Sequence, residues 1–152
     1  MTASADDTFA TLHRAADAAC GARLFTVTVL DRKARLARRA YTSHPVEYPA
    51  TGTKPMRDDA WSDQVIGRGV SFVANTTPEF AIYFPDHPLI NQLGCQSALN
   101  MPVSDGAQVV GTVNVLDVEG HFTPERVATL ERLVAEHRPA LLAAFAKVPM
   151  GQ

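Results

Sequence analysis

Two apolar segments near residue 100 carry amide and hydroxyl side chains at alternate positions. The segments are residues 96–103 and 109–117, and their polar side chains include Asn100, Thr112 and Asn114. Carboxamides and hydroxyls donate and accept hydrogen bonds, so strands that carry them in apolar surroundings are suited to line something polar. A covered polar group left unpaired costs on the order of 1–3 kcal/mol. We therefore expect these side chains to contact a bound small molecule, water, or a covering loop that they hold in place.

The residue beside these segments that could react as a nucleophile is Cys95. It lies two residues before Ser97, and the other cysteine, Cys20, falls at the end of the first predicted helix, which we expect to be remote from the pocket. A thiol with no resolving partner needs an outside thiol to complete a cycle of disulfide exchange. We therefore interpret Cys95 as a buried structural cysteine. Two cysteines without a CxxC spacing also predict free thiols in a reducing, cytoplasmic compartment.

The histidines form no pattern typical of a metal or catalytic site. None of the five has metal-ligand spacing, and the sequence holds no HExxH, glycine-rich phosphate loop or Ser-His-Asp arrangement. We predict no catalytic residue, no metal ligand and no cofactor. His44, which begins the proline-containing segment 44–56, is the histidine that we expect to face a pocket. His87, beside Asp86, is more typical of an exposed helix start.

Length and composition are those of one globular domain. A chain of 152 residues can bury roughly 68–70% of its unfolded surface around one core, and we expect a single domain over residues 1–152. The net charge of −2 gives no field that attracts nucleic acid or an acidic membrane. No stretch approaches the roughly 18 apolar residues of a membrane span. Basic residues gather in one run, which we interpret as a solvated turn and edge strand: Arg32, Lys33, Arg35, Arg38 and Arg39.

Hydrophobic periodicity and turn residues predict elements in the order α, β, β, α, β, α, β, β, α. The helices cover residues 4–20, 58–67 and 86–94, with Asp86 as a cap of the third, and a final helix begins at Thr123 and is interrupted at Pro139. The strands cover residues 24–30, 35–43, 70–75, 96–103 and 109–117. Hairpins at both ends of this strand list imply a mostly antiparallel sheet with the terminal helices on one face. Segment 44–56 holds three prolines, and we expect an ordered but irregular covering loop there.

Alternation along the strands predicts which side chains share each face of the sheet. One face takes the apolar positions, which we expect to pack against the terminal helices: Leu99, Met101, Val103, Val109, Val113 and Val115. The other face gathers Ala98, Asn100, Thr112 and Asn114, with Thr26 and Thr28 from the first strand. Aromatic residues of the covering segments complete a pocket for a small polar organic ligand. The candidate ligand-binding residues are Tyr41, His44, Tyr48, Trp61, Phe84, Asn100, Thr112 and Asn114.

The order of these motifs resembles the GAF domain family. The stretch CQSALNMPVSDGAQVVGTVNVL is similar to the end of a GAF domain, and FTPERVATLERLVAEHRPAL is similar to the family's closing helix. The first helix, a Gly-Ala turn and a Phe-containing strand fit as well, so the resemblance spans about residues 5–147. It implies an α+β fold related to profilin-like and PAS domains, with six antiparallel strands where the residues alone predict five. It also implies terminal helices on one face and a cavity under short helices and loops on the other.

The resemblance implies a sensory or regulatory domain that binds a small molecule without transforming it. The family's cyclic-nucleotide signature Asn-Lys-x-Phe-Asp-Glu is missing, and so is the adjacent Cys-His pair of its bilin-binding members. Haem would need a pocket histidine, which His44 or His87 could supply, but nothing else in the sequence favours it. One branch reduces free methionine-(R)-sulfoxide with pocket cysteines. Its essential cysteine lies farther ahead of the strand's serine than Cys95 does, and no resolving cysteine is nearby.

We therefore expect a stand-alone, cytoplasmic GAF-type domain that recognises a small polar metabolite, and two alternatives stay open. One is a methionine sulfoxide reductase that uses Cys95, and the other is a protein-interaction module whose pocket is vestigial. Alanine-rich stripes on both terminal helices permit close helix approach and favour a homodimer. Seven residues follow Phe145, so a sensor of this length is expected to act through contact with a partner protein.

Overall fold

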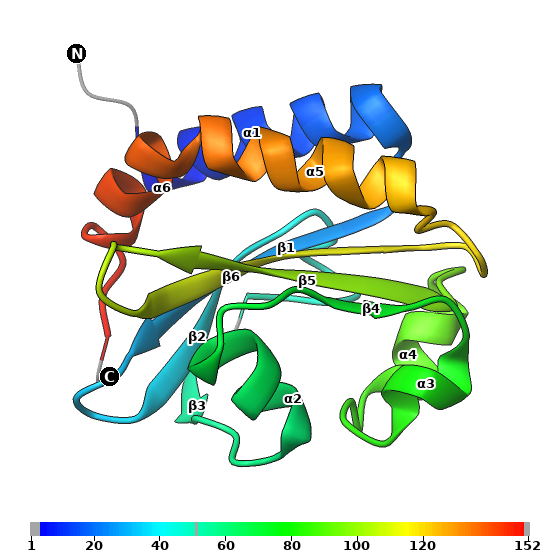
Figure 1. Ribbon diagram of the computed structural model, residues 1–152, viewed down its shortest axis with the longest axis horizontal. Helices are drawn as coiled ribbons and strands as arrows, with labels where there is room; N and C mark the ends of the chain where they lie inside the picture. Colours follow the sequence, from blue (N-terminus) through cyan, green and yellow to red (C-terminus); the bar gives the residue numbers. More distant parts are fainter. Residues whose placement is uncertain (1–3, 51, 151–152) are drawn as a thin grey trace.

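One sheet separates a layer of long helices from a layer of short helices and loops (Figure 1). The computed structural model describes residues 4–50 and 52–150. Its helices are α1 (Ala5–Cys20), α2 (Ala60–Ser62), the π-helical turn η1 (Asp63–Gly67), α3 (Thr77–Ala81), α4 (His87–Gln92), α5 (Pro124–Glu136) and α6 (Arg138–Phe145). Its strands are β1 (Leu24–Asp31), β2 (Leu36–Thr42), β3 (Thr53–Pro55), β4 (Phe72–Ala74), β5 (Ser97–Ser104) and β6 (Val109–Asp117).

The strands pair antiparallel throughout, in the order β3-β2-β1-β6-β5-β4. The predicted α+β architecture with a sheet of six strands is therefore confirmed. The sixth strand is β3, which lies within segment 44–56 and pairs with β2 from Leu36 to Arg38. The prediction that this whole segment is irregular is wrong there. Because β3 covers β2, the basic run does not form an edge strand.

Helices α1, α5 and α6 cover one face of the sheet (Figure 1). Ser4 and Asp7 form a capping box at the start of α1, and the Thr123 hydroxyl accepts from the Arg126 N–H at the start of α5. Pro139 cannot donate a backbone hydrogen bond, and the last helical stretch divides into α5 and α6 beside it. The layer and the sheet enclose the main core, whose largest fully buried side chains include Phe9, Phe25, Leu12, Leu99, Leu130 and Leu141.

The strand register places side chains on the two faces as the alternation predicts. The apolar set Leu99, Met101, Val103, Val113 and Val115 is buried beneath the helices. Asn100 pairs with Asn114 across β5 and β6, and Thr26 pairs with Asn114 across β1 and β6. These polar side chains therefore share the opposite face. Val109, which is also buried, pairs with Ser104 beyond a register shift in the β5–β6 hairpin.

Short helices and loops cover the polar face of the sheet. Helices α2, α3 and α4 lie on this side (Figure 1), where a smaller apolar cluster forms from Leu24, Tyr48, Ala74, Phe80, Ile90, Cys95, Ala98 and Leu116. The sequence patterns do not predict α3, because its five residues are too few to show a helical period. None of the helices in the described part of the chain has the length and apolar character needed to span a membrane.

Candidate ligand-binding site

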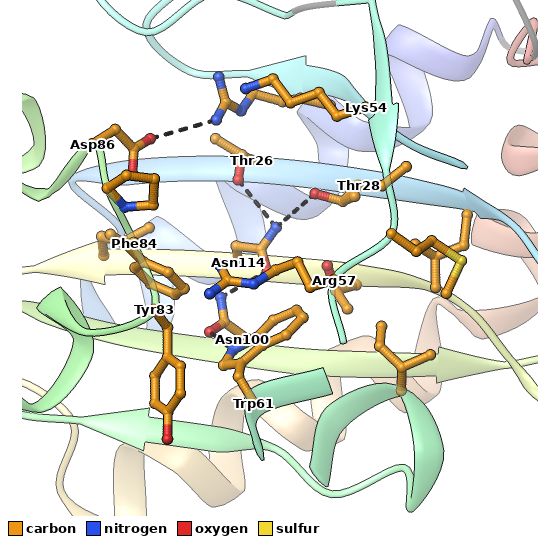
Figure 2. A pocket seen from close by; sticks show the side chains of 18 of the residues that line it. Thr26, Thr28, Lys54, Arg57, Trp61, Tyr83, Phe84, Asp86, Asn100 and Asn114 are labelled. Carbon is orange, nitrogen blue, oxygen red and sulfur yellow. Dashed lines mark hydrogen bonds and ion pairs between the residues drawn. The ribbon is translucent and has the colours of Figure 1, made fainter. Parts of the chain in front are cut away.

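A cavity of about 520 Å³ lies between the polar face of the sheet and the segments that cover it (Figure 2). Its volume falls within the range of about 300–1,000 Å³ typical of small-molecule pockets. Six of the candidate residues line it: Tyr48, Trp61, Phe84, Asn100, Thr112 and Asn114. The two other candidates, Tyr41 and His44, do not line it. Ligand binding by the lining residues stays a prediction.

A chain of side-chain hydrogen bonds crosses the floor of the cavity (Figure 2). The Trp61 indole N–H donates to the Asn100 carbonyl at 2.9 Å, and the Asn100 amide donates to the Asn114 carbonyl at 2.9 Å. The Asn114 amide donates in turn to the hydroxyls of Thr26 and Thr28, at 3.1 and 3.3 Å. Each amide is therefore held in one orientation. The asparagines both line the cavity and tie the covering helix α2 to the sheet.

Two polar groups of the floor have hydrogen-bonding capacity left. The Thr112 hydroxyl makes no hydrogen bond to another side chain among the described residues, although its residue is only 2% exposed. The Asn100 amide uses one of its two N–H donors within the floor network. A ligand can therefore bond to the floor without breaking a contact that holds the fold.

Aromatic side chains form one wall of the cavity. Trp61 and Phe84 meet edge to face with ring centroids 6.4 Å apart, and Phe84 packs against Phe80 of α3 at 5.5 Å. Tyr83 lines the cavity next to Phe84. Aromatic faces of this kind suit a planar, apolar part of a ligand.

The segment before α2 fixes the position of Trp61. The Asp59 carboxylate accepts from the Ser62 N–H at 2.9 Å and the Asp59 N–H donates to the Ser62 hydroxyl at 2.8 Å, which completes a capping box. Arg57 donates to the same carboxylate through Nε and Nη2, at 3.0 and 2.8 Å. Burial acts to raise the pKa of Asp59, but the bonds from Ser62 and Arg57 outweigh it and hold that pKa below its usual range. The carboxylate therefore stays ionised and keeps Trp61 over the floor.

A tyrosine, a carboxylate and a guanidinium join three segments at one end of the cavity. The Tyr48 hydroxyl donates to the Asp86 carboxylate, and Nη2 of Arg39 lies 3.7 Å from the same carboxylate oxygen. The Arg39 guanidinium also stacks 3.8 Å from the centre of the Tyr48 ring and donates to the Pro49 carbonyl at 2.9 Å. Burial raises the pKa of Tyr48 well above its ordinary value, so the phenol remains a hydrogen-bond donor. These contacts connect β2, the covering loop and the start of α4.

Two loop residues have roles that differ from those predicted. Asp86 makes no side-chain cap bond to α4, because its carboxylate turns toward Tyr48 instead. His44 does not line the cavity: its Nδ1 lies 2.8 Å from the Ser43 hydroxyl, and its carbonyl accepts from the Tyr48 N–H at 2.8 Å. His44 therefore shapes the turn that places Tyr48.

Tyr41 faces the long helices, so the prediction that its side chain lines the cavity is wrong. Val27 pairs with Tyr41, but the next residue of β1, Thr28, pairs with Arg39. Ala40 is thus the extra residue of a β-bulge, and such a residue reverses the alternation of every position beyond it. Tyr41 accordingly packs against the main core while Arg39 faces the cavity.

A comparison with protein-family models agrees with this architecture. The model described as GAF domain matches residues 2–140. The chain belongs to the GAF domain family. GAF domains are generally sensory domains that bind small molecules. A comparison with curated protein sequences finds no match.

Solved structures share the fold of this GAF domain at low sequence identity. The second GAF domain of DevS from Mycobacterium smegmatis is 19% identical over 93% of this chain and 95% of that chain, with a TM-score of 0.66. The GAF domain of an Acinetobacter phosphoenolpyruvate-protein phosphotransferase is 13% identical over 99% and 89%, with a TM-score of 0.72. The blue-light absorbing form of the PixJ GAF domain from Thermosynechococcus elongatus is 11% identical over 90% and 84%, with a TM-score of 0.67. Likeness at these identities shows the fold alone.

The thiol of Cys95 is buried in this GAF domain and does not line the cavity. The residue is 0% exposed and belongs to the apolar cluster on the second face. Burial, assisted by the nearby Asp117 carboxylate, raises the pKa of the Cys95 thiol to about 11. Because the thiolate is the nucleophile, a protonated, covered thiol is inert at neutral pH.

Charged residues are the part of the site that the sequence reasoning missed. Arg39, Lys54 and Arg57 line the cavity, although the sequence suggested a solvated run for the first and gave no role to the others. A signal existed for Arg39, since simple alternation places it on the same face as Tyr41, which was a candidate ligand-binding residue. No such signal existed for Lys54, because β3 is three residues long and shows no alternation of its own.

Proposed function

We propose that this GAF domain is a non-catalytic sensor that binds a small polar organic molecule in the cavity. The observation that carries the proposal is the floor network, in which Asn100 and Asn114 have fixed orientations while the Thr112 hydroxyl is left for a ligand. Convergent polar groups of fixed orientation give a pocket its specificity, and aromatic walls supply contact area. In this proposal residues 1–152 form one sensory unit.

The structure offers less support for the two alternatives. A reductase needs a thiolate that reaches its substrate, whereas the Cys95 thiol is covered and its pKa is about 11. A vestigial pocket is expected to fill with side chains, whereas this one keeps a volume of about 520 Å³. Binding without chemical change is therefore the function that the geometry favours.

The sensor is further proposed to act as a homodimer that contacts a partner protein in the cytoplasm. Ala18 and Ala19 on α1 and Ala143 on α6 are exposed on the layer of long helices, and small side chains there permit close approach of a second helix layer. Both cysteines are free, which suits a reducing compartment. Sedimentation velocity at micromolar concentration tests the dimer, and a single species of 16.4 kDa would contradict it.

A thermal-shift screen against a library of small polar metabolites tests the binding function. We expect at least one compound to raise the melting temperature, and Thr112→Val to weaken its binding measured by calorimetry. This substitution removes the cavity hydroxyl and keeps the shape of the side chain. Thr11→Val makes the same chemical change on an exposed position of α1 and serves as the matched control. The proposal fails if no compound shifts the melting temperature, or if both variants bind every hit as the wild type does.

A further inference from the structure

Positive charge gathers along one side of the cavity. The charged residues that line it are Arg39 from β2, Lys54 from β3, Arg57 two residues after β3, and Asp86 before α4. Three cations thus face one carboxylate, in a chain whose net charge is −2. The local excess runs against the charge of the whole molecule, so overall composition does not explain it.

The three cations differ in how far protein groups neutralise them. Arg57 forms two hydrogen bonds with Asp59, and Arg39 lies near Asp86 at 3.7 Å. The Lys54 ammonium, in contrast, has neither a hydrogen bond nor an ion pair with another described residue. In Figure 2 the Lys54 side chain extends from β3 toward the end of the cavity marked by the Asp86 ion pair. Lys54 is therefore a cation without a counter-charge at the rim of a pocket.

The aromatic wall does not offer a free site for a cationic ligand. The Arg57 guanidinium carbon lies 5.4, 5.9 and 5.7 Å from the ring centres of Trp61, Tyr83 and Phe84. These rings already face a protein cation at cation–π distance. A cationic group beside these rings would be repelled by the charge of Arg57, and by that of Lys54 and Arg39.

We propose that the ligand of this cavity is a small organic anion, a carboxylate or a phosphate ester, attached to a planar apolar group. The inference rests on the proposed binding function and names the ligand class. The anionic group lies near Lys54 and Arg39, where charge-assisted hydrogen bonds are available. The planar group lies along the wall formed by Trp61 and Phe84, and a polar substituent on it reaches the Thr112 hydroxyl.

Matched probes that differ in charge test the inference. Indole-3-acetate, indole-3-acetamide and tryptamine share one ring system and are anionic, neutral and cationic at pH 7. Phenyl phosphate and phenol form a second pair that separates phosphate from carboxylate recognition. Each is titrated into the ¹⁵N-labelled chain, and the indole N–H signal of Trp61, the one tryptophan of the chain, reports on the cavity.

At least one anion is expected to bind about tenfold more tightly than its neutral partner, the effect of one charge-assisted hydrogen bond. Lys54→Met should reduce that ratio to about twofold without changing the affinity of the neutral probe, and Lys54→Arg should restore it. Lys33→Met removes the same charge at an exposed position in the turn after β1 and should leave the ratio unchanged. Added salt should weaken binding of the anionic probe and leave binding of the neutral probe unchanged.

The outcomes separate this inference from the function on which it rests. If the neutral probes bind as tightly as the anions, or tryptamine binds best, the inference is overturned and the binding function stands. The inference also fails if Lys54→Met and Lys33→Met change the anion's affinity equally. If none of the probes shifts the Trp61 signal, the ligand class is wrong, and the metabolite screen then decides the binding function separately.

Discussion

The two faces of the sheet come from the same strands, yet one is packed solid and the other is left hollow. Beneath α1, α5 and α6, Val27, Leu99 and Val113 belong to one core cluster with Phe9 and are fully buried. The neighbouring positions on the same strands carry threonine and asparagine, and these side chains border a cavity of about 520 Å³. Period-two alternation therefore divides the same backbone between a face packed into the core and a face that borders the cavity.

The covers of the two faces differ in the same way. Three helices of eight to sixteen residues close the apolar face, whereas short helical turns and a loop close the polar one. The short cover is held at particular points, by Trp61 on Asn100 and by Tyr48 on Asp86. Local opening costs least where few contacts are lost, so we expect the short cover to open more readily than the layer of long helices.

Replacing one phenylalanine on each face by alanine should give the largest loss of stability, and the loss should differ most between the two faces. Phe9→Ala leaves a cavity in the main core, where the side chain is 0% exposed, and should cost about 3–5 kcal/mol of unfolding free energy. Phe84→Ala removes a half-buried ring of the pocket wall and should cost about 1–2 kcal/mol, with a larger loss of ligand affinity. Urea unfolding measures both. Equal losses of stability would mean that the pocket wall is part of the core.

Enlarging a small side chain on each face should test which face has room. A Cβ on Gly111 would lie 2.6 Å from the Phe145 ring and 2.7 Å from the Thr28 carbonyl oxygen, so Gly111→Ala should destabilise by about 1–3 kcal/mol. Ala37→Val adds bulk to a residue that lines the cavity, and should leave stability within about 0.5 kcal/mol while reducing ligand affinity. Thermal unfolding distinguishes them, and a destabilised Ala37→Val would show that the cavity has no space at β2.

Loosening the short cover should have an intermediate effect. Tyr48→Phe removes the hydroxyl that donates to Asp86 and should cost about 1.5 kcal/mol. Hydrogen exchange should speed up in residues 44–50 and 84–92 and stay unchanged in α1. Tyr83→Phe is the matched control, since the Tyr83 hydroxyl makes no hydrogen bond to another described residue. If the two variants exchange alike, the Tyr48–Asp86 contact does not hold the cover.

The sequence predicts the division between the faces better than it predicts the rim of the pocket. Asn100 and Asn114 follow from alternation in two long strands with clear turns. The prediction that Tyr41 lines the cavity is wrong because the bulge at Ala40 depends on the pairing of β1 with β2. Alternation along one strand does not reveal that pairing. Lys54 was not predicted to line the cavity because β3 forms only through its pairing with β2. Features set by one strand were therefore predictable, and features set by pairs of strands were not.

The smallest effect should come from the two cysteines, which lie on opposite sides of the same sheet. Cys95 is fully buried in the cluster beneath the short cover, while Cys20 at the end of α1 is half-buried. Iodoacetamide should therefore modify Cys20 in the folded protein and Cys95 only after unfolding. Mass spectrometry of digested, labelled protein reads this directly.

The same thiol should give a weak dependence of stability on alkaline pH. The folded pKa of Cys95 is raised to about 11, above the value of about 8.5 for an unfolded thiol. The contribution of the protonated thiol to the free energy of unfolding is therefore complete below about pH 8.5 and is lost as pH rises toward 11. The loss reached at pH 9 is less than about 1 kcal/mol. Cys95→Ala should remove this part of the alkaline slope in urea unfolding, whereas Cys20→Ala should not. Rapid labelling of native Cys95, together with an unchanged slope in Cys95→Ala, would mean that the short cover opens far more readily than the packed face does.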